Sequence, residues 1–210
     1  MTQRERVRSR QPPPRRFGTG SPANAWAFAE GSTLDQFNEY LTLQNPGTSP
    51  VTVDLTYFTD GGAHPRKTLT LPAQTRTTVE VFSGDPTSSV SACTPNGPGA
   101  NCGVGRGIGG VAVVAQGENG GQFVPERVMY VNGFSFGSGP IADAHDAFGA
   151  TSTPTLWYFA EGTTLSGFNE YLTLANLAGQ PASADITYVT DGGQSIQRHI
   201  TIPATSRYTV

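Results

Sequence analysis

Charged residues, cysteines and long apolar runs are all scarce in this chain of 210 residues. Asp, Glu, Lys and Arg together make up 14% of it, and hydrophobic residues make up 36%. No apolar run approaches the roughly 18 residues that a membrane-spanning helix needs, so no transmembrane segment is expected. No long window is rich in Leu, Glu, Lys and Ala either. This composition excludes a helical bundle.

Basic residues are few outside the N-terminus. Residues 1–16 contain six Arg and one Glu, so the remainder is more acidic than the net charge of −3 indicates. An acidic body argues against nucleic-acid binding, which depends on clustered Lys and Arg. Residues 1–24 are predicted to be a basic, Pro- and Arg-rich disordered tail. No apolar segment follows Met1 as in a signal peptide, so we expect a misplaced start or a piece of a longer precursor.

Cysteine occurs twice, as Cys93 and Cys102, in a stretch rich in Gly, Pro and Asn. We predict a disulfide that closes this loop, which implies an oxidising compartment. The alternative is a metal site, but two thiols without a nearby His or second Cys pair make a weaker case for zinc.

Glycine and proline, in contrast, are abundant, with 26 Gly and 16 Pro. They separate short segments in which apolar and polar residues alternate, a pattern typical of half-buried strands. Residues 83–110 and 133–153 are predicted to be loops. The predicted strands cover 37–45, 51–58, 68–71, 76–82, 110–116 and 124–132.

The chain also repeats itself. The motif Trp26–Gly31 returns as Trp157–Gly162, 131 residues later, and about 29 of the 54 positions from Trp26 to Val79 are identical in the second copy. Self-similarity at a fixed offset indicates tandem units. We predict a first repeat at 25–150 and a second, truncated repeat at 151–210, without fixing the phase of the repeat.

A chain of strands without helices must bury its sheet faces against one another. The predicted fold is therefore all-β, a tandem immunoglobulin-like β-sandwich with an incomplete second repeat. Three explanations of the incomplete repeat are open. The chain is a fragment, the strands of 110–132 complete the later copy, or another subunit donates strands by edge pairing.

Several of these motifs resemble a poorly characterised bacterial repeat of large secreted or cell-surface proteins. They are the Trp-x-Phe-Ala-Glu-Gly motif, Phe-Asn-Glu-Tyr-Leu-Thr-Leu-x-Asn, Thr-Tyr-x-Thr-Asp-Gly-Gly and Pro-Ala-x-x-Arg. Glu126–Tyr130 and His145–Ala150 match the usual continuation of that repeat. The resemblance covers roughly residues 25–210 and implies extracytoplasmic β-sandwich modules. It transfers no catalytic residue.

Two carboxylates per copy are candidates for acid–base chemistry, since a glycoside hydrolase needs such a pair. They are Glu30 and Glu39 in the first copy, and Glu161 and Glu170 in the second. A structural ion pair with an arginine beside the Trp is the favoured interpretation. The expected pairs join Glu30 with Arg76 and Glu161 with Arg207.

Aromatic residues offer a second candidate site, because aromatic faces stack on sugar rings. The candidates for ligand contact are Trp26, Tyr40, Trp157 and Tyr171. Packing in the core is the favoured role for the tryptophans.

Asp143, His145 and Asp146 form a third cluster, but their spacing is weak evidence for a metal site, and a loop held by local hydrogen bonds is favoured. The glycine-rich segment 103–110 precedes a strand, so it lacks the helix that a phosphate loop requires. We expect no metal, no cofactor and no enzyme activity.

The sequence thus predicts a non-catalytic structural or adhesive module of an extracellular or cell-surface protein. Its expected partners are other copies of itself or a cell-surface polymer or glycan. The alternatives are a carbohydrate-binding accessory module, and a self-assembling subunit whose incomplete repeat a neighbouring chain completes through strand addition.

Overall fold

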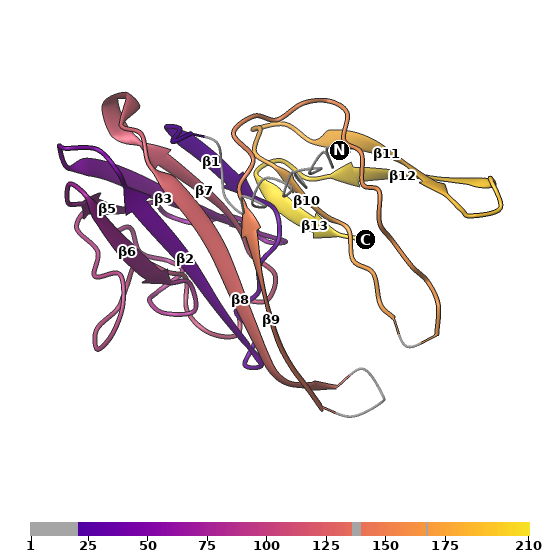
Figure 1. The fold of residues 1–210 in the computed structure, drawn as a ribbon, viewed down its shortest axis with the longest axis horizontal. Coiled ribbons are helices and arrows are strands. Elements are labelled where there is room, and N and C mark those ends of the chain that lie inside the picture. Colours follow the sequence, from indigo (N-terminus) through magenta and orange to yellow (C-terminus); the bar gives the residue numbers. More distant parts are fainter. Residues whose placement is uncertain (1–20, 136–139, 167) are drawn as a thin grey trace, which may run out of the picture.

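A computed structural model describes residues 21–135, 140–166 and 168–210 (Figure 1). The predicted N-terminal tail lies outside the described residues as far as residue 20. The described chain is all-β, as predicted, with antiparallel strands and one short 3-10 turn at Glu118–Gly120.

One sheet is built around β3. Its path runs from β1 through β7 and β3 to β4, and β5 also pairs with β3. The strands are β1 (Ala25–Phe28), β3 (Val51–Thr59), β4 (Gly62–Ala63), β5 (Lys67–Leu71) and β7 (Ala112–Gly117). The central pair, β3 and β7, consists largely of β-branched and small apolar residues, which suit strands covered on one face.

The other sheet has the order β6-β2-β8-β9. Its strands are β2 (Phe37–Asn45), β6 (Thr75–Glu80), β8 (Val124–Ser135) and β9 (Pro140–Phe148). All its pairs are antiparallel. Together the two sheets form a sandwich with one hydrophobic core.

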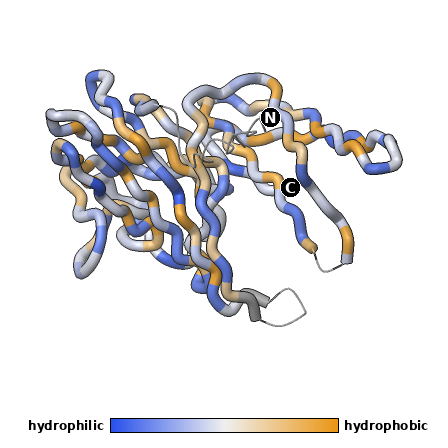
Figure 2. Tube along the Cα trace, viewed as in Figure 1, coloured by the Kyte–Doolittle hydropathy of each residue, from blue (hydrophilic) through white to orange (hydrophobic). Residues whose placement is uncertain are grey.

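The core follows from the period-two pattern of the strands. Leu41 and Leu43 of β2 point inward and are fully buried, as are Val53 and Leu55 of β3. The intervening positions are less buried, and Gln44 is exposed. Figure 2 shows this alternation of hydrophobic and hydrophilic positions along the strands. Burial of these apolar side chains is the main driving force for closing the sandwich.

The long loop between β6 and β7 is closed by the predicted disulfide, and both of its cysteines belong to the core cluster. Cys93 and Cys102 are bonded, with their Cα atoms 5.0 Å apart. The hydroxyl of the fully buried Tyr57 donates a hydrogen bond of 2.9 Å to the Cys102 carbonyl. The loop therefore contributes to the core although it has little regular structure of its own.

The prediction of a loop at 133–153 is wrong for most of that segment. β8 continues to Ser135, and β9 pairs with it antiparallel, with an irregularity between Asn132 and Phe134. The sequence signal was weak because β9 alternates alanine with polar residues rather than large apolar with polar ones. Pairing with β8 supplies the hydrogen bonds that the local sequence does not predict.

The second copy forms two small sheets. β10 (Thr173–Asn176) pairs with β13 (Ser206–Thr209), and β11 (Ala182–Val189) pairs with β12 (Ser195–Ile202). The apolar side chains of the second Trp motif are exposed, in contrast to their first-copy equivalents. Trp157 is 52% exposed, whereas Trp26 on β1 is 2% exposed.

Local interactions recur at the 131-residue offset. The Asn45 side-chain amide donates to the carbonyls of Ser49, Leu71 and Pro72, while its oxygen accepts from the Gly47 N–H. Asn176 makes the equivalent four hydrogen bonds, to Gln180, Ile202, Pro203 and Ala178. The two copies thus share side-chain interactions as well as residues.

Candidate functional site

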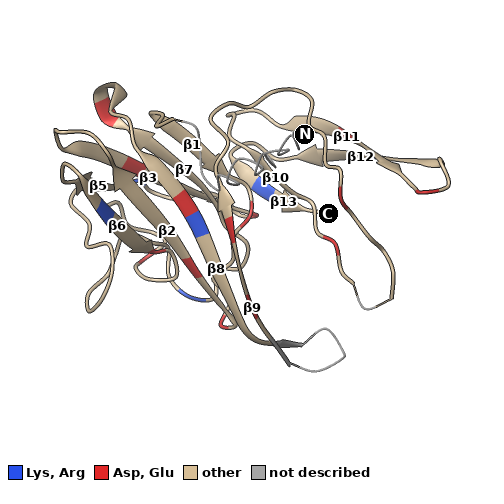
Figure 3. Ribbon diagram, viewed as in Figure 1, with Lys and Arg blue, Asp and Glu red and all other residues tan. Residues whose placement is uncertain are grey.

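A cluster of ionisable side chains lies where the second copy meets the first sandwich. It draws Glu30 from the loop after β1, Glu39 from β2, Arg127 from β8, His145 from β9 and Arg207 from β13. Figure 3 shows Lys, Arg, Asp and Glu scattered over the strands and loops of both copies. The contacts among these five side chains, rather than the number of charges, distinguish the junction.

Glu39 is the most deeply buried carboxyl of the cluster. It is fully buried, and its Oε2 accepts a hydrogen bond of 2.7 Å from the Ser32 N–H. Its Oε1 has no hydrogen-bond partner among the described residues. Burial raises the pKa of Glu39 to about 8, and the charge of Arg127 opposes this shift only in part. Glu39 is therefore protonated at neutral pH.

The carboxyl group of Glu39 also fits over Gly31. A Cβ added at Gly31 would overlap both of its oxygens, so only glycine fits there. The second copy repeats the arrangement, since a Cβ added at Gly162 would lie 2.6 Å from Glu170 Oε1. This recurrence explains the Glu-Gly and Asn-Glu-Tyr motifs as one structural unit of each copy.

Glu30 binds a different arginine from the one predicted. Its Oε2 lies 2.8 Å from Arg127 Nη2, and its Oε1 lies 3.2 Å from His145 Nε2. The hydrogen bond with His145, followed by the charge of Arg127, lowers the pKa of Glu30. Arg76 instead lies exposed on β6, because alternation along that strand turns it away from the core. The predicted Glu30–Arg76 pair is therefore wrong.

Arg207 reaches from the second copy into the first. Its Nε donates a hydrogen bond of 3.2 Å to the Ala29 carbonyl, and its Nη1 lies 3.8 Å from Asp60 Oδ1. The side chain fits against Gly110, where an added Cβ would overlap Nη1. Arg207 is only 7% exposed. It thus contacts the end of the first sandwich rather than Glu161, the predicted partner.

The arrangement suits structure better than catalysis. A general acid or base must reach a substrate, whereas Glu39 is sealed in the core and Glu30 is held by Arg127 and His145. Removing any partner would leave a buried charge or polar group unpaired, which is costly. The cluster is best described as a set of structural contacts at the junction of the two copies.

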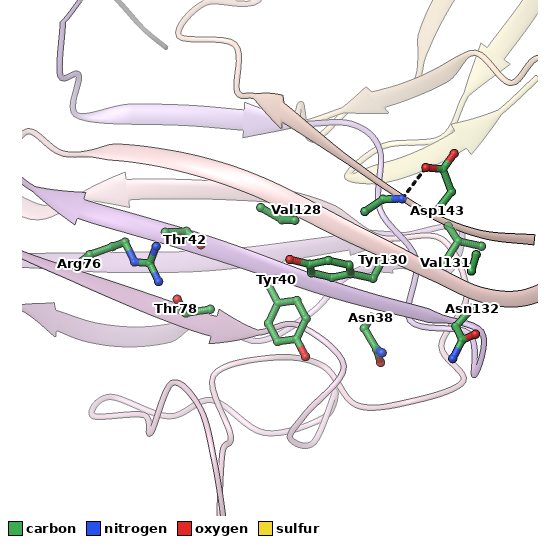
Figure 4. A pocket seen from close by; sticks show the side chains of 12 residues that line it. Asn38, Tyr40, Thr42, Arg76, Thr78, Val128, Tyr130, Val131, Asn132 and Asp143 are labelled. Carbon is green, nitrogen blue, oxygen red and sulfur yellow. Dashed lines mark hydrogen bonds between the residues drawn. The ribbon is translucent and has the colours of Figure 1, made fainter. Parts of the chain in front are cut away.

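An open groove on the outer face of β2, β6 and β8 is the second candidate site (Figure 4). Tyr40 and Tyr130 lie in it with their rings edge to face, 5.9 Å apart between centroids. Tyr40 also packs edge to face on Phe82, at 5.3 Å. Polar side chains surround the two tyrosines: Asn38, Thr42, Arg76, Thr78 and Asn132.

The four aromatic residues that the sequence offered for ligand contact therefore lie in different environments. Tyr40 lies in the groove, half-buried, and Trp157 and Tyr171 are exposed on the second copy. Trp26 is a core residue whose Nε1 donates to the Phe123 carbonyl at 3.0 Å. Its burial makes a ligand-contact role for Trp26 wrong, while the core role is confirmed.

The cluster of Asp143, His145 and Asp146 lies on β9, not in a loop. Strand alternation puts Asp146 on the opposite face from the other two. His145 faces Arg127, whose positive charge disfavours a cation there. The described residues contain no group of three or more His, Cys, Asp or Glu placed to hold a metal ion. They also contain no helix long and apolar enough to cross a membrane.

Sequence reasoning did not single out Arg127 and did not pair it with Glu30 and His145. A signal was present, because Arg127 occupies an inward position of β8, directly opposite the buried Leu41. An arginine at an inward strand position requires a carboxylate partner. Alternation therefore predicts the need for a partner, but not which acidic residue meets it.

Comparisons with known proteins find one family model that is similar to part of the chain. The model of a family of unknown function (DUF5719) matches residues 20–90. No curated protein matches the chain. Among solved structures, the chain is similar to the crystal structure of Thermotoga maritima 1070, at 12% identity and a TM-score of 0.43, over 61% of this chain and 93% of that one.

Proposed function

We propose that the chain is a non-catalytic structural or adhesive part of a secreted or cell-surface protein, built from tandem immunoglobulin-like β-sandwich repeats. The observation that carries the proposal is the junction, where a buried arginine of one copy binds the end of the other. Repeats that contact their neighbours in this way make a defined rod or stalk.

The linker between the copies supports this function. Ala27 of β1 and Ala150 exchange two backbone hydrogen bonds of 2.8 Å, and Gly149 lies directly against the Phe28 ring. The linker is thus bound to the first sandwich rather than free. Two copies fixed by both a linker and a buried arginine transmit force better than copies joined by a flexible tether.

The disulfide supports a location outside the cytoplasm. Structural disulfides persist in oxidising compartments and are rare in cytosolic proteins. Cys93 and Cys102 are part of the core cluster, so their bond is structural rather than a surface redox pair. The resemblance to bacterial surface repeats points to the same compartment.

Localisation in the native cells tests the proposal. Antibody detection after fractionation should find the protein in the secreted or surface fraction, with both cysteines protected from thiol-specific labelling until reduction. Protease applied to intact cells should remove it. Recovery in the cytosol with two free thiols would contradict the proposal.

A carbohydrate-binding accessory module is the second candidate, and the groove favours it. Tyr130 is 49% exposed beside Tyr40, with amide and hydroxyl groups around them. Aromatic faces with a few polar neighbours are typical of sugar sites. A glycan array should detect binding that Tyr130→Ala abolishes. Tyr158→Ala, at a position 87% exposed on the second copy, is the matched control. Binding that survives Tyr130→Ala would exclude the groove.

A further inference from the structure

The strand β5 is paired with β3 on one side and covered on the other by residues 85–93, a segment termed the strap. The Thr68 N–H donates to the Val90 carbonyl at 2.8 Å, and the Val90 N–H donates to the Arg66 carbonyl at 3.1 Å. The Cys93 N–H donates to the Thr68 carbonyl at 2.9 Å. An uncovered sheet edge is a template for pairing with another chain, and a loop that covers the edge prevents this pairing.

Lys67 of β5 binds the strap from inside the sandwich. Its side chain is fully buried, and its ammonium group donates hydrogen bonds to the carbonyls of Asp85, at 2.8 Å, and Ser88. His64 adds a further contact, since its Nδ1 lies 3.1 Å from the Pro86 carbonyl oxygen. A buried ammonium group is costly unless hydrogen-bond acceptors replace its water. Lys67 therefore needs the strap in place.

The disulfide joins the end of the strap to a fixed part of the core. Cys93 is the last residue of the strap and is bonded to Cys102, whose carbonyl accepts the hydrogen bond from Tyr57. Close by, the Val104 N–H donates to the Val81 carbonyl at 2.9 Å. Without the bond, the strap would be part of a long loop with little regular structure, and ordering such a loop costs conformational entropy.

We propose that the Cys93–Cys102 bond closes the strap over β5, and that the edge of β5 stays open until this bond forms outside the reducing cytoplasm. The oxidant is a protein or small molecule that contains a disulfide. One cysteine thiolate attacks that disulfide to give a mixed disulfide, and the other cysteine then displaces the oxidant, which leaves with two thiols, the two electrons and the two protons. The bond is made once, during maturation. The proposal rests on the extracytoplasmic location proposed above.

Amide hydrogen exchange of the purified full chain, oxidised and after reduction with a phosphine, tests the proposal. The amides of Thr68, Val90 and Cys93 should exchange at least about tenfold faster in the reduced protein, because their hydrogen bonds open with the strap. The amides that pair β2 with β8 should keep their rates. The double variant Cys93→Ser/Cys102→Ser should behave as the reduced protein does. Ser89→Ala, at an exposed position of the strap, is the matched control and should behave as the oxidised wild type does.

Two results would overturn the proposal. Unchanged exchange of the three amides after reduction would show that the strap stays closed without the bond. Equal acceleration in β2 and β8 would show that the disulfide stabilises the whole sandwich and not the strap. The reduced wild type decides the matter if the double variant fails to fold. Cell fractionation tests the location and exchange of the purified protein tests the strap, so the failure of one proposal is distinguishable from the failure of the other.

Discussion

Glu39 shows how a single residue serves two purposes in this fold. Its carboxyl group accepts the Ser32 N–H and so fixes the loop after β1, but its burial opposes ionisation. A buried acid is tolerated when it stays protonated. The sequence alone singled out Glu39 as a repeated carboxyl group. Its protonation depends on burial between two sheets, and the sequence around Glu39 does not reveal that burial.

The raised pKa of Glu39 predicts a pH dependence of stability. In the unfolded chain its pKa is near 4.5, and in the folded protein it is about 8. Between these values the folded state binds the extra proton, so stability should fall as pH rises, by at most about 1.4 kcal/mol per pH unit. The stabilisation is complete below pH 4.5 and is lost as pH passes 8.

The variant Glu39→Gln should flatten this dependence, because it cannot ionise yet keeps an acceptor for Ser32. Urea unfolding at several pH values between 5 and 8 measures the slope. Glu118→Gln, in the exposed 3-10 turn, should keep the wild-type slope. Glu30 does not interfere, because its lowered pKa stabilises the fold above pH 4.5 and matters only in acid. An unchanged slope in Glu39→Gln would refute the assignment.

At the scale of elements, the turn after β2 depends on one side chain. Asn45 is fully buried, and its amide group links the carbonyls of Ser49, Leu71 and Pro72 with the Gly47 N–H. Each unmade buried hydrogen bond costs about 1 kcal/mol or more. Asn45→Ala should therefore lower the free energy of unfolding by about 3 kcal/mol, as measured by urea titration.

Gln44→Ala is the natural control for Asn45→Ala. Gln44 is the preceding residue of β2 and is exposed, so its replacement should change the free energy of unfolding by less than about 0.5 kcal/mol. Equal effects of the two substitutions would show that the strand, and not the amide network, is the sensitive feature.

The elements also show what a sequence can predict here. The strands with large apolar residues at every second position, such as β2 and β3, were predicted nearly to the residue. β9 was missed because its alanines differ little in hydrophobicity from the polar residues between them. Its pairing with β8 depends on the tertiary structure and not on the local sequence. The Glu30–Arg127 pair was missed for the same reason. Ionic partners come from different sheets, and their distance is set by the packing of the sandwich.

At the scale of the whole molecule, the repeat predicts a relation between copies, but its geometry comes only from the structure. Arg76 and Arg207 are equivalent in sequence, yet one is exposed and the other buried. The exposure of the two arginines differs because Arg207 packs against the first sandwich, whereas Arg76 lies in an open groove. Domain boundaries at 25–150 and 151–210 remain a prediction, because the linker and Arg207 bind the copies together.

Gly110 gives a direct test of that junction. A Cβ at this position would overlap Arg207 Nη1. The backbone of Gly110 does not have a positive φ, so a side chain there causes no backbone strain. Gly110→Val should therefore displace the Arg207 side chain without distorting the backbone at residue 110. Amide hydrogen exchange of β13 should then accelerate at least about tenfold, and small-angle scattering should show a larger radius of gyration. Gly179→Val, where no atom lies within 4 Å of the added Cβ, should change neither.

A second background separates the junction from general destabilisation. In Arg207→Ala the guanidinium is already absent, so adding Gly110→Val should produce no further acceleration of exchange in β13. Additive effects of the two substitutions would mean that Gly110 acts on the first sandwich itself. A wild-type exchange rate in Gly110→Val would mean that Arg207 does not hold the copies together. Non-additivity is thus the specific signature of one arginine binding one glycine-lined site, and it is the property expected of repeats that work as a rod.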